Sequence, residues 1–145
     1  MKEETTSRLV GILENINNKN DGKKFIREHS KKNLETFASF FNKCLNEKKL
    51  VLADVVKKSG ISTNYVYQII NGKKNPSRDK LIALCIAASM SFKETNRGLV
   101  LGGYAPLYPK NKREIHIGIC INTGMSSVVE VNICLEENGE EPLKV

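Results

Sequence analysis

The side chains best suited to chemistry in this sequence are the amides and hydroxyls between Gly60 and Gly72. In an α-helix they would fall on one side of the segment, with aliphatic residues on the other. The polar side carries Thr63, Asn64, Tyr67, Gln68 and Asn71, and the apolar side carries Val66, Ile69 and Ile70. A side-chain amide offers a donor and an acceptor together, which matches the edge of adenine in the DNA major groove. The segment therefore predicts a base-reading surface, with an ordinary solvated helix face as the alternative.

Basic residues follow this segment at once. Residues 48–80 hold eight Lys/Arg and two Asp/Glu, a net +6, against +7 for the whole chain, whereas residues 111–145 hold three against six, a net −3. A local positive field of this kind suits a polyanion. The cations expected to contact DNA phosphates are Lys73, Lys74 and Arg78, joined by Lys80. Such contacts would add affinity and register without sequence information.

Composition limits the other functional classes. The chain has 145 residues, 40% of them hydrophobic and 27% charged, which suits one globular unit with a real core. The four cysteines form no Cys-x-x-Cys pair and neither histidine lies near one, so we expect reduced, buried thiols and no metal site. No run approaches the roughly 20 apolar residues of a membrane span, and we expect a cytoplasmic protein without membrane association.

Signatures of catalysis are missing from the sequence. It contains no Gly-x-Ser-x-Gly, Walker loop or His-Glu-x-x-His. The glutamates at 136, 137, 140 and 141 have no motif around them and are interpreted as an exposed acidic end. We therefore expect neither an enzyme nor a cofactor.

Helical periodicity divides the chain into three parts. Residues 1–32 are predicted to form a helix and a linker, "NNKNDGKK", outside the main core. Residues 33–103 show five helical segments, whose starts are Leu34, Val51, Ser62, Ser77 and Ser91. Each of the last three starts can act as an N-cap, and Gly60, Asn71-Gly72 and Gly102-Gly103 are typical helix ends.

Residues 104–145 support two interpretations. The stretch "IHIGICI" alternates with a period of two, which is typical of a strand. The flanking signals are helical, because Asn111 precedes Glu114 by three residues, Ser127 precedes Glu130 by three, and a glycine follows each segment. We predict a helical hairpin, and a β-hairpin remains the alternative.

Two short helices joined at Gly60 form the arrangement that presents a helix to the major groove. The residues "ISTNYVYQIINGKKNPSRDKLIALCIAASMS" resemble the phage-repressor and Cro (XRE-type) class of helix-turn-helix regulators, most specifically in Asn-Gly-Lys-x-x-Pro-Ser. The resemblance covers about residues 34–103. It implies an all-α, five-helix, lambda-repressor-like bundle in a sequence-specific DNA-binding transcriptional regulator. The tract after residue 103 is similar to a bacterial subset that has a helical C-terminal extension.

The resemblance also implies roles for single residues. Thr63, Asn64 and Gln68 match base-reading positions of the class, beside Tyr67, whose ring can stack on a base. Ser62, Asn71 and Lys73 match positions that contact phosphate. Because one short helix reads only a few base pairs, we expect a homodimer on double-stranded DNA, with the C-terminal hairpin as the candidate interface.

Two positions depart from the class. Leu52 stands where a glutamine commonly braces the DNA backbone, and Ile70 stands where a glutamate is common. Together with the acidic tail, these apolar residues support an alternative function. In this alternative the protein is an interaction module that kept the helix-turn-helix fold but binds another protein, as an accessory or antitoxin-like component.

Overall fold

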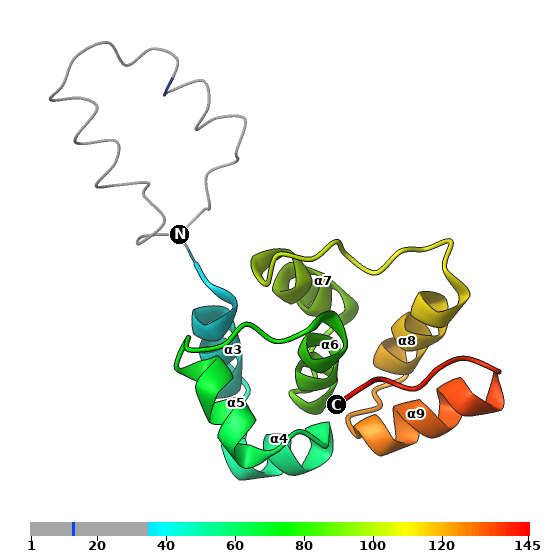
Figure 1. Ribbon diagram of the computed structural model, residues 1–145, viewed down its shortest axis with the longest axis horizontal. Coiled ribbons are helices and arrows are strands. Elements are labelled where there is room, and N and C mark those ends of the chain that lie inside the picture. Colours follow the sequence, from blue (N-terminus) through cyan, green and yellow to red (C-terminus); the bar gives the residue numbers. More distant parts are fainter. Residues whose placement is uncertain (1–12, 14–34) are drawn as a thin grey trace, which may run out of the picture. The chain divides into compact units, whose positions relative to one another are not determined.

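The computed structural model describes residue 13 and residues 35–145. The helix and linker expected in residues 1–32 lie outside the described residues, except for Leu13, which is helical and exposed. Residues Thr36–Val145 form one compact unit. This unit contains seven helices and no strand: α3 (Phe37–Glu47), α4 (Leu52–Ser59), α5 (Thr63–Ile70), α6 (Arg78–Ala87), α7 (Phe92–Leu101), α8 (Lys112–Asn122) and α9 (Val128–Glu137) (Figure 1). None of the described helices is long and apolar enough to cross a membrane.

The helix starts predicted at Ser62, Ser77 and Ser91 are confirmed, whereas the first helix of this region, α3, begins at Phe37 with Thr36 as its N-cap and not at Leu34. The hydroxyl of Ser62 accepts a hydrogen bond from the Tyr65 amide, and the hydroxyl of Ser77 does the same for Lys80. Ser91 and Glu94 form a complete capping box at the start of α7. Each cap satisfies an amide that has no partner within its own helix, so these starts are set by local sequence.

The C-terminal hairpin is helical as predicted, and the β-hairpin alternative is wrong. The Asn111 side chain accepts a hydrogen bond from the Glu114 amide at the start of α8. Ile117 and Ile121 are buried, whereas Ile115 and Ile119 are exposed. The isoleucines that suggested a period of two are thus divided between the two sides of one helix. Ser127 is the N-cap of α9, although its side chain makes no capping hydrogen bond.

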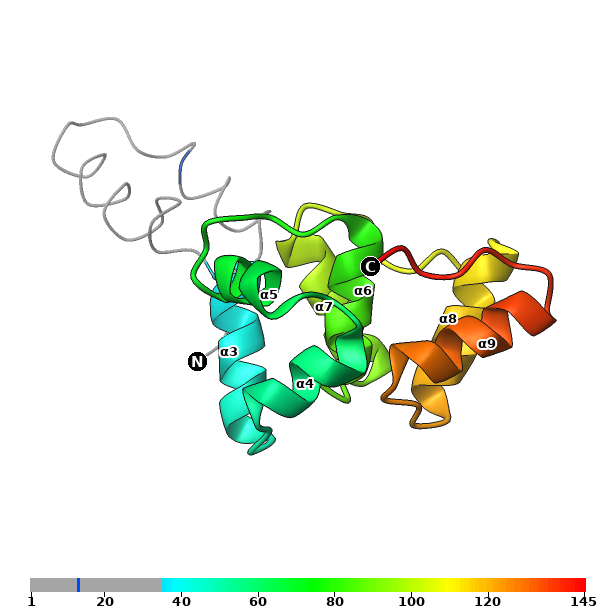
Figure 2. The ribbon, with the colours of Figure 1, turned by 60° about the horizontal axis from the view of Figure 1, so that its bottom comes forward.

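Helices α6 and α7 occupy the middle of the Thr36–Val145 unit. Figures 1 and 2 show them between α3, α4 and α5 on one side and α8 and α9 on the other. The residues of α6 from Leu81 to Ala87 are all buried because this helix has neighbours on both sides. The C-terminal residue Val145 lies beside α6 (Figure 1). It also lies close to the turn after α4, since a Cβ added to Gly60 would be 3.3 Å from Cγ2 of Val145.

The unit contains an internal repeat that our sequence analysis did not identify. The segment formed by α6, α7 and the residues up to Tyr108 is repeated by α8, α9 and the residues up to Lys144. Identical residues occupy equivalent places in the two segments: Arg78 and Arg113, Ile82 and Ile117, Cys85 and Cys120, Met90 and Met125, Asn96 and Asn132, Leu99 and Leu135, Pro106 and Pro142, and Leu107 and Leu143. We call these segments the first and second repeats.

Hydrogen bonds support the alignment of the repeats. In the first repeat the Asn96 side-chain oxygen accepts from the Leu107 amide at 2.9 Å. In the second repeat the Asn132 oxygen accepts from the Leu143 amide at 2.7 Å. Each asparagine therefore ties the segment that follows its hairpin back onto the second helix.

The four cysteines form no disulfide, and three of them are buried. Burial raises the pKa of the Cys85 thiol, with a smaller contribution from Cys44. Burial, followed by the neighbouring Cys134, raises the pKa of Cys120 to about 11. These thiols are protonated at neutral pH and pack as small apolar side chains.

Candidate nucleic-acid interface

The turn between α4 and α5 is fixed by local contacts. The hydroxyl of Ser59 is buried, where it donates to the Val56 carbonyl at 2.8 Å and accepts from the Ile61 amide at 3.1 Å. Gly60 has a φ of 74°, which a side chain would strain, and Ile61 is buried immediately after it. The orientation of α5 relative to α4 is consequently specified by the short sequence between them.

Helix α5 has a buried side and an uncharged polar side. Val66 and Ile69 are buried and hold the helix against the core. Thr63, Asn64 and Tyr67 are exposed on the other side. Gln68 is half-buried, and it follows Tyr67 on this polar side. The four predicted base-reading residues thus lie on one helix, with three of them open to solvent.

The other end of α5 is also fixed. Asn71 is the C-cap and is exposed, and its backbone amide donates to the carbonyls of α5. The amides of Lys73 and Lys74 both donate to the Gln68 carbonyl, at 2.8 and 3.1 Å. The Asn42 side chain donates to the Ile70 carbonyl from α3. This loop holds the exposed Lys73 and Lys74 side chains directly beside the end of α5.

Tyr65 organises two of the cations and was missed by our sequence analysis. The ammonium nitrogen of Lys80 lies 4.0 Å from the centre of the Tyr65 ring, and that of Lys74 lies 5.1 Å from it. A cation is attracted to the negative face of an aromatic ring. Because Lys80 belongs to α6, the sequence spacing carries no signal for this contact. The ring keeps two positive charges next to the polar side of α5.

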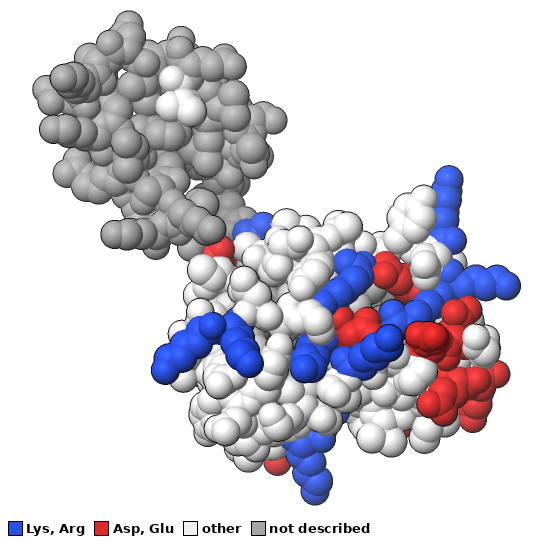
Figure 3. Space-filling model, viewed as in Figure 1, with Lys and Arg blue, Asp and Glu red and all other residues white. Residues whose placement is uncertain are grey.

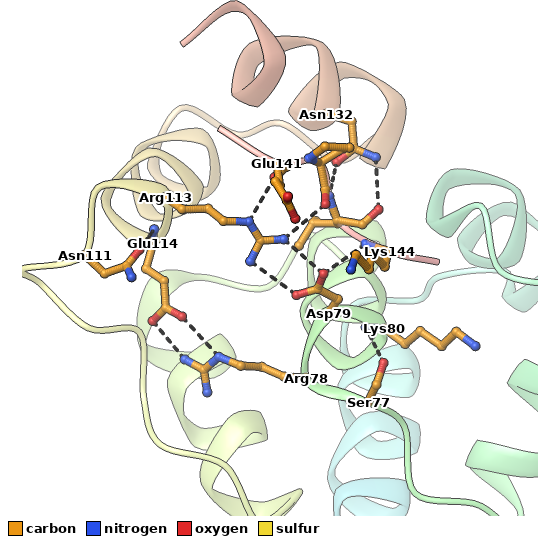
Figure 4. A network of polar contacts seen from close by, with 12 residues as sticks. Ser77, Arg78, Asp79, Lys80, Asn111, Arg113, Glu114, Asn132, Glu141 and Lys144 are labelled. Atoms are coloured by element: carbon orange, nitrogen blue, oxygen red, sulfur yellow. Dashed lines mark hydrogen bonds and ion pairs between the residues drawn. The ribbon is translucent and has the colours of Figure 1, made fainter. Parts of the chain in front are cut away.

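Arg78 is placed differently from our expectation of a phosphate contact. Its Nε and Nη2 donate to the two carboxylate oxygens of Glu114 at 3.1 and 2.9 Å. Its Nη1 and Nη2 also donate to the carbonyls of Ala105 and Pro106. Figure 4 shows the pair with Glu114. Together these internal partners occupy all three guanidinium nitrogens, so we remove Arg78 from the candidate interface.

Asp79 makes the reciprocal connection. Its carboxylate accepts from both terminal nitrogens of Arg113, at 3.3 and 2.9 Å, and from the backbone amide of Lys144. Arg113 also donates to the carbonyls of Glu141 and Pro142 (Figure 4). The first acidic residue after the lysine-rich loop in the sequence is therefore paired within the molecule.

The charges are unevenly distributed over the unit. Lys and Arg side chains are spread over α5, α6 and the start of α8, whereas acidic side chains gather over the end of α9 and the residues after it (Figure 3). The exposed acidic residues there are Glu136, Glu137 and Glu141. A polyanion would meet attraction at the first region and repulsion at the second.

The two departures from the class have a structural explanation. Leu52 and Ile70 are both half-buried and pack against the hydrophobic core. Their apolar side chains therefore serve packing within the fold. Both keep part of their surface open to solvent, and the glutamates of the acidic tail at 136, 137 and 141 are more exposed than either.

Comparison with known proteins identifies the region that contains this surface. A family model described as helix-turn-helix matches residues 41–92, from the middle of α3 to the start of α7. No curated protein and no solved structure matches the chain. The matched residues include the whole of α4, the turn, α5 and the lysine-rich loop.

Proposed function

Because residues 41–92 form a helix-turn-helix domain of the phage-repressor and Cro (XRE) class, we propose that the protein is a sequence-specific, DNA-binding transcriptional regulator that reads the major groove with α5. Proteins of this class bind DNA and are not enzymes. A helix whose outer side offers amides and hydroxyls can distinguish base pairs by their hydrogen-bonding edges. The recognition residues in this proposal are Thr63, Asn64, Tyr67 and Gln68.

One observation carries the proposal. The outer side of α5 displays amides and hydroxyls between two fixed ends, and it has no charged residue from Thr63 to Asn71. A helix side that only faces solvent usually carries Lys, Glu or Arg. Uncharged donors and acceptors held on a rigid helix are instead suited to reading base edges.

Backbone contacts would surround this reading surface. Ser62 and Asn71 stand at the two ends of α5, and Lys73 and Lys74 extend from the loop that follows. The Tyr65 ring holds Lys74 and Lys80 beside the same helix. These groups supply salt-dependent affinity and position α5 in the groove.

The regulator acts as a homodimer in the cytoplasm. A single recognition helix contacts only a few base pairs, and two copies on half-sites about 10 bp apart supply the missing affinity and specificity. Symmetry of the protein then requires a pseudo-palindromic DNA site.

Selection from random duplex DNA with the purified full chain tests the proposal. We expect enrichment of a pseudo-palindrome. At that site Asn64→Ala and Gln68→Ala each weaken binding by about 1–3 kcal/mol and relax the preference at single positions. Lys73→Ala weakens all sequences alike and makes the salt dependence shallower. Asn46→Ala, an exposed asparagine on α3, is the matched control and leaves binding unchanged.

The competing function predicts a different result. An interaction module that binds another protein through its acidic extension would enrich no DNA sequence, would not be retained on heparin and would co-purify with a partner. That combination would reject the regulator.

A further inference from the structure

The hairpin of α8 and α9 presents an apolar outer side to solvent. Ile115 and Ile119 lie one turn apart on α8 and are 41% and 52% exposed. Val129 and Ile133 lie one turn apart on α9 and are 66% and 51% exposed. Both pairs are on the side of their helix opposite to its buried residues. We call these four residues the outer face; exposed apolar surface of this kind is typical of interaction sites.

The first repeat shows how the equivalent of an outer-face residue is buried when another helix packs against it. Ile119 of the second repeat is equivalent to Leu84 of the first. Leu84 is completely buried because α6 packs against α4 as well as α7. Among residues 35–145, no helix covers the outer face of α8 in the same way. The second repeat therefore keeps an apolar residue at a position whose equivalent is buried in the first.

We propose that the outer face binds the outer face of a second copy of this chain, with α8 of each copy packed against α9 of the other. The proposal deepens the proposed function, since it identifies the partner surface that makes the regulator a dimer. The twofold axis runs along the hairpin, between its two helices. Ile115 of one copy then lies opposite Ile133 of the other, and Ile119 lies opposite Val129.

Charges at one end of the outer face select this arrangement. The exposed stripe of α8 begins with Lys112, and that of α9 ends with Glu136. The start of α8 lies near the residues that follow α9, because Arg113 donates to the Glu141 carbonyl at 2.9 Å, and Lys112 and Glu136 are therefore at the same end of the hairpin. The proposed axis sets Lys112 of each copy against Glu136 of the other, and the pair occurs twice. Packing α8 against α8 would instead place Lys112 opposite the neutral Asn122.

The location of the outer face leaves DNA recognition undisturbed. The middle helices α6 and α7 separate the hairpin from α5 (Figures 1 and 2). Acidic side chains gather near the hairpin's charged end (Figure 3), where a DNA phosphate would be repelled. A partner copy at the hairpin thus leaves both recognition helices uncovered.

Sedimentation of the purified full chain without DNA tests the inference. We expect a dimer, and Ile119→Glu raises its dissociation constant at least about 100-fold because each dimer buries two such charges in an apolar contact. Val100→Glu is the matched control, since Val100 is also apolar and 49% exposed but lies on α7. It leaves the dimer unchanged. A monomeric wild type, or a dimer that responds equally to both changes, would overturn the inference. Circular dichroism establishes that each variant is folded.

A charge exchange tests the orientation. Lys112→Glu and Glu136→Lys each weaken their own homodimer by placing like charges together. When the two variants are mixed, both contacts regain opposite charges, and the mixture forms a heterodimer about 10-fold or more tighter than either homodimer. Absence of this preference would reject the packing of α8 against α9.

The outcome is separable from that of the proposed function. A monomer that enriches a single half-site in DNA selection would overturn the outer-face contact and keep the regulator. A dimer that responds to Ile119→Glu but enriches no DNA sequence would keep the contact and reject the regulator.

Discussion

The first and second repeats have similar sequences and different surroundings. In α6, Ile82, Leu84 and Ile86 are all buried, because this helix lies between two groups of helices. In α8, Ile117 and Ile121 are buried, but Ile119 between them is exposed. The shared pattern thus specifies the helical hairpin and the side that faces its own repeat. Whether the opposite side is covered depends on neighbours from elsewhere.

Two equivalent arginines, Arg78 and Arg113, connect the two repeats. Arg78 pairs with Glu114 and closes its own repeat through the Ala105 and Pro106 carbonyls. Arg113 does the equivalent with Asp79, Glu141 and Pro142. Each arginine therefore binds the acid of the other repeat and the C-terminal segment of its own. This reciprocity gives the junction an approximate twofold symmetry.

The largest difference between the repeats should appear in their equivalent apolar residues. Leu84→Ala removes a fully buried side chain and is expected to lower the free energy of unfolding by about 2–5 kcal/mol. Ile119→Ala at the half-exposed equivalent position is expected to cost less than about 1 kcal/mol in the monomer. Urea unfolding at low protein concentration measures both. Equal costs would mean that the outer side of α8 is buried within the monomer.

The junction between the repeats provides the second test. Arg113→Ala leaves the Asp79 carboxylate, whose side chain is only 18% exposed, without its ion pair. We expect a loss of about 2–3 kcal/mol, since an unpaired charge in a largely buried place is costly. Arg78→Ala should cost about the same because Glu114 is in the equivalent position. Lys110→Ala, at an exposed lysine in the preceding loop, is the control.

A double variant distinguishes the pair from simple packing. Arg113→Ala combined with Asp79→Ala should cost clearly less than the sum of the single changes, because the second change removes the stranded charge. Additive costs would show that the two residues act independently.

Local signals explain why so much of the fold could be predicted. Caps at Ser62, Ser77 and Ser91 and the glycine at position 60 specify their elements through contacts only a few residues away. The polar side of α5 follows from helical periodicity, and all of Thr63, Asn64 and Tyr67 are exposed as that pattern requires.

Contacts between distant residues explain what the sequence did not reveal. A basic residue beside a lysine-rich loop suggests a phosphate contact, yet Arg78 pairs with Glu114 from a different helix. Lys80 and Tyr65 meet only because α5 and α6 fold together. The repeat was accessible to sequence comparison, since Asn96, Pro106 and Leu107 recur as Asn132, Pro142 and Leu143, but helical periodicity alone does not detect it.

The equivalent asparagines Asn96 and Asn132 differ in the number of hydrogen bonds that they make, and a smaller difference in stability follows. Asn96 accepts one hydrogen bond from Leu107, whereas Asn132 accepts one from Leu143 and also donates to its carbonyl at 3.4 Å. We expect Asn96→Ala to lower the free energy of unfolding by about 1 kcal/mol and Asn132→Ala by about 1–2 kcal/mol. Thermal unfolding measures both changes. A larger cost for Asn96 would contradict the assigned contacts.

The smallest difference concerns the starts of α7 and α9. Ser91 and Glu94 form a capping box, whereas the equivalent Ser127 makes no side-chain cap. Ser91→Ala is therefore expected to cost about 1 kcal/mol in denaturant unfolding, and Ser127→Ala close to nothing. A comparable cost at Ser127 would show that α9 has a cap in solution that the structure lacks.

Glu94, in the capping box at the start of α7, makes the stability of the fold depend on pH. Burial opposes its ionisation, but hydrogen bonds from the Ser91 backbone and from Lys48, with the charge of Lys48, outweigh it and lower the pKa of this carboxyl. A carboxyl whose pKa is lower in the folded state stabilises the fold above its unfolded pKa, about 4.3, and this contribution is lost as the pH falls through the folded value. Glu94→Gln should therefore reduce stability at pH 7 and make its decline between about pH 5 and 3 shallower. Urea unfolding across this pH range measures both effects, and a decline as steep as that of the unchanged protein would refute the contribution of Glu94.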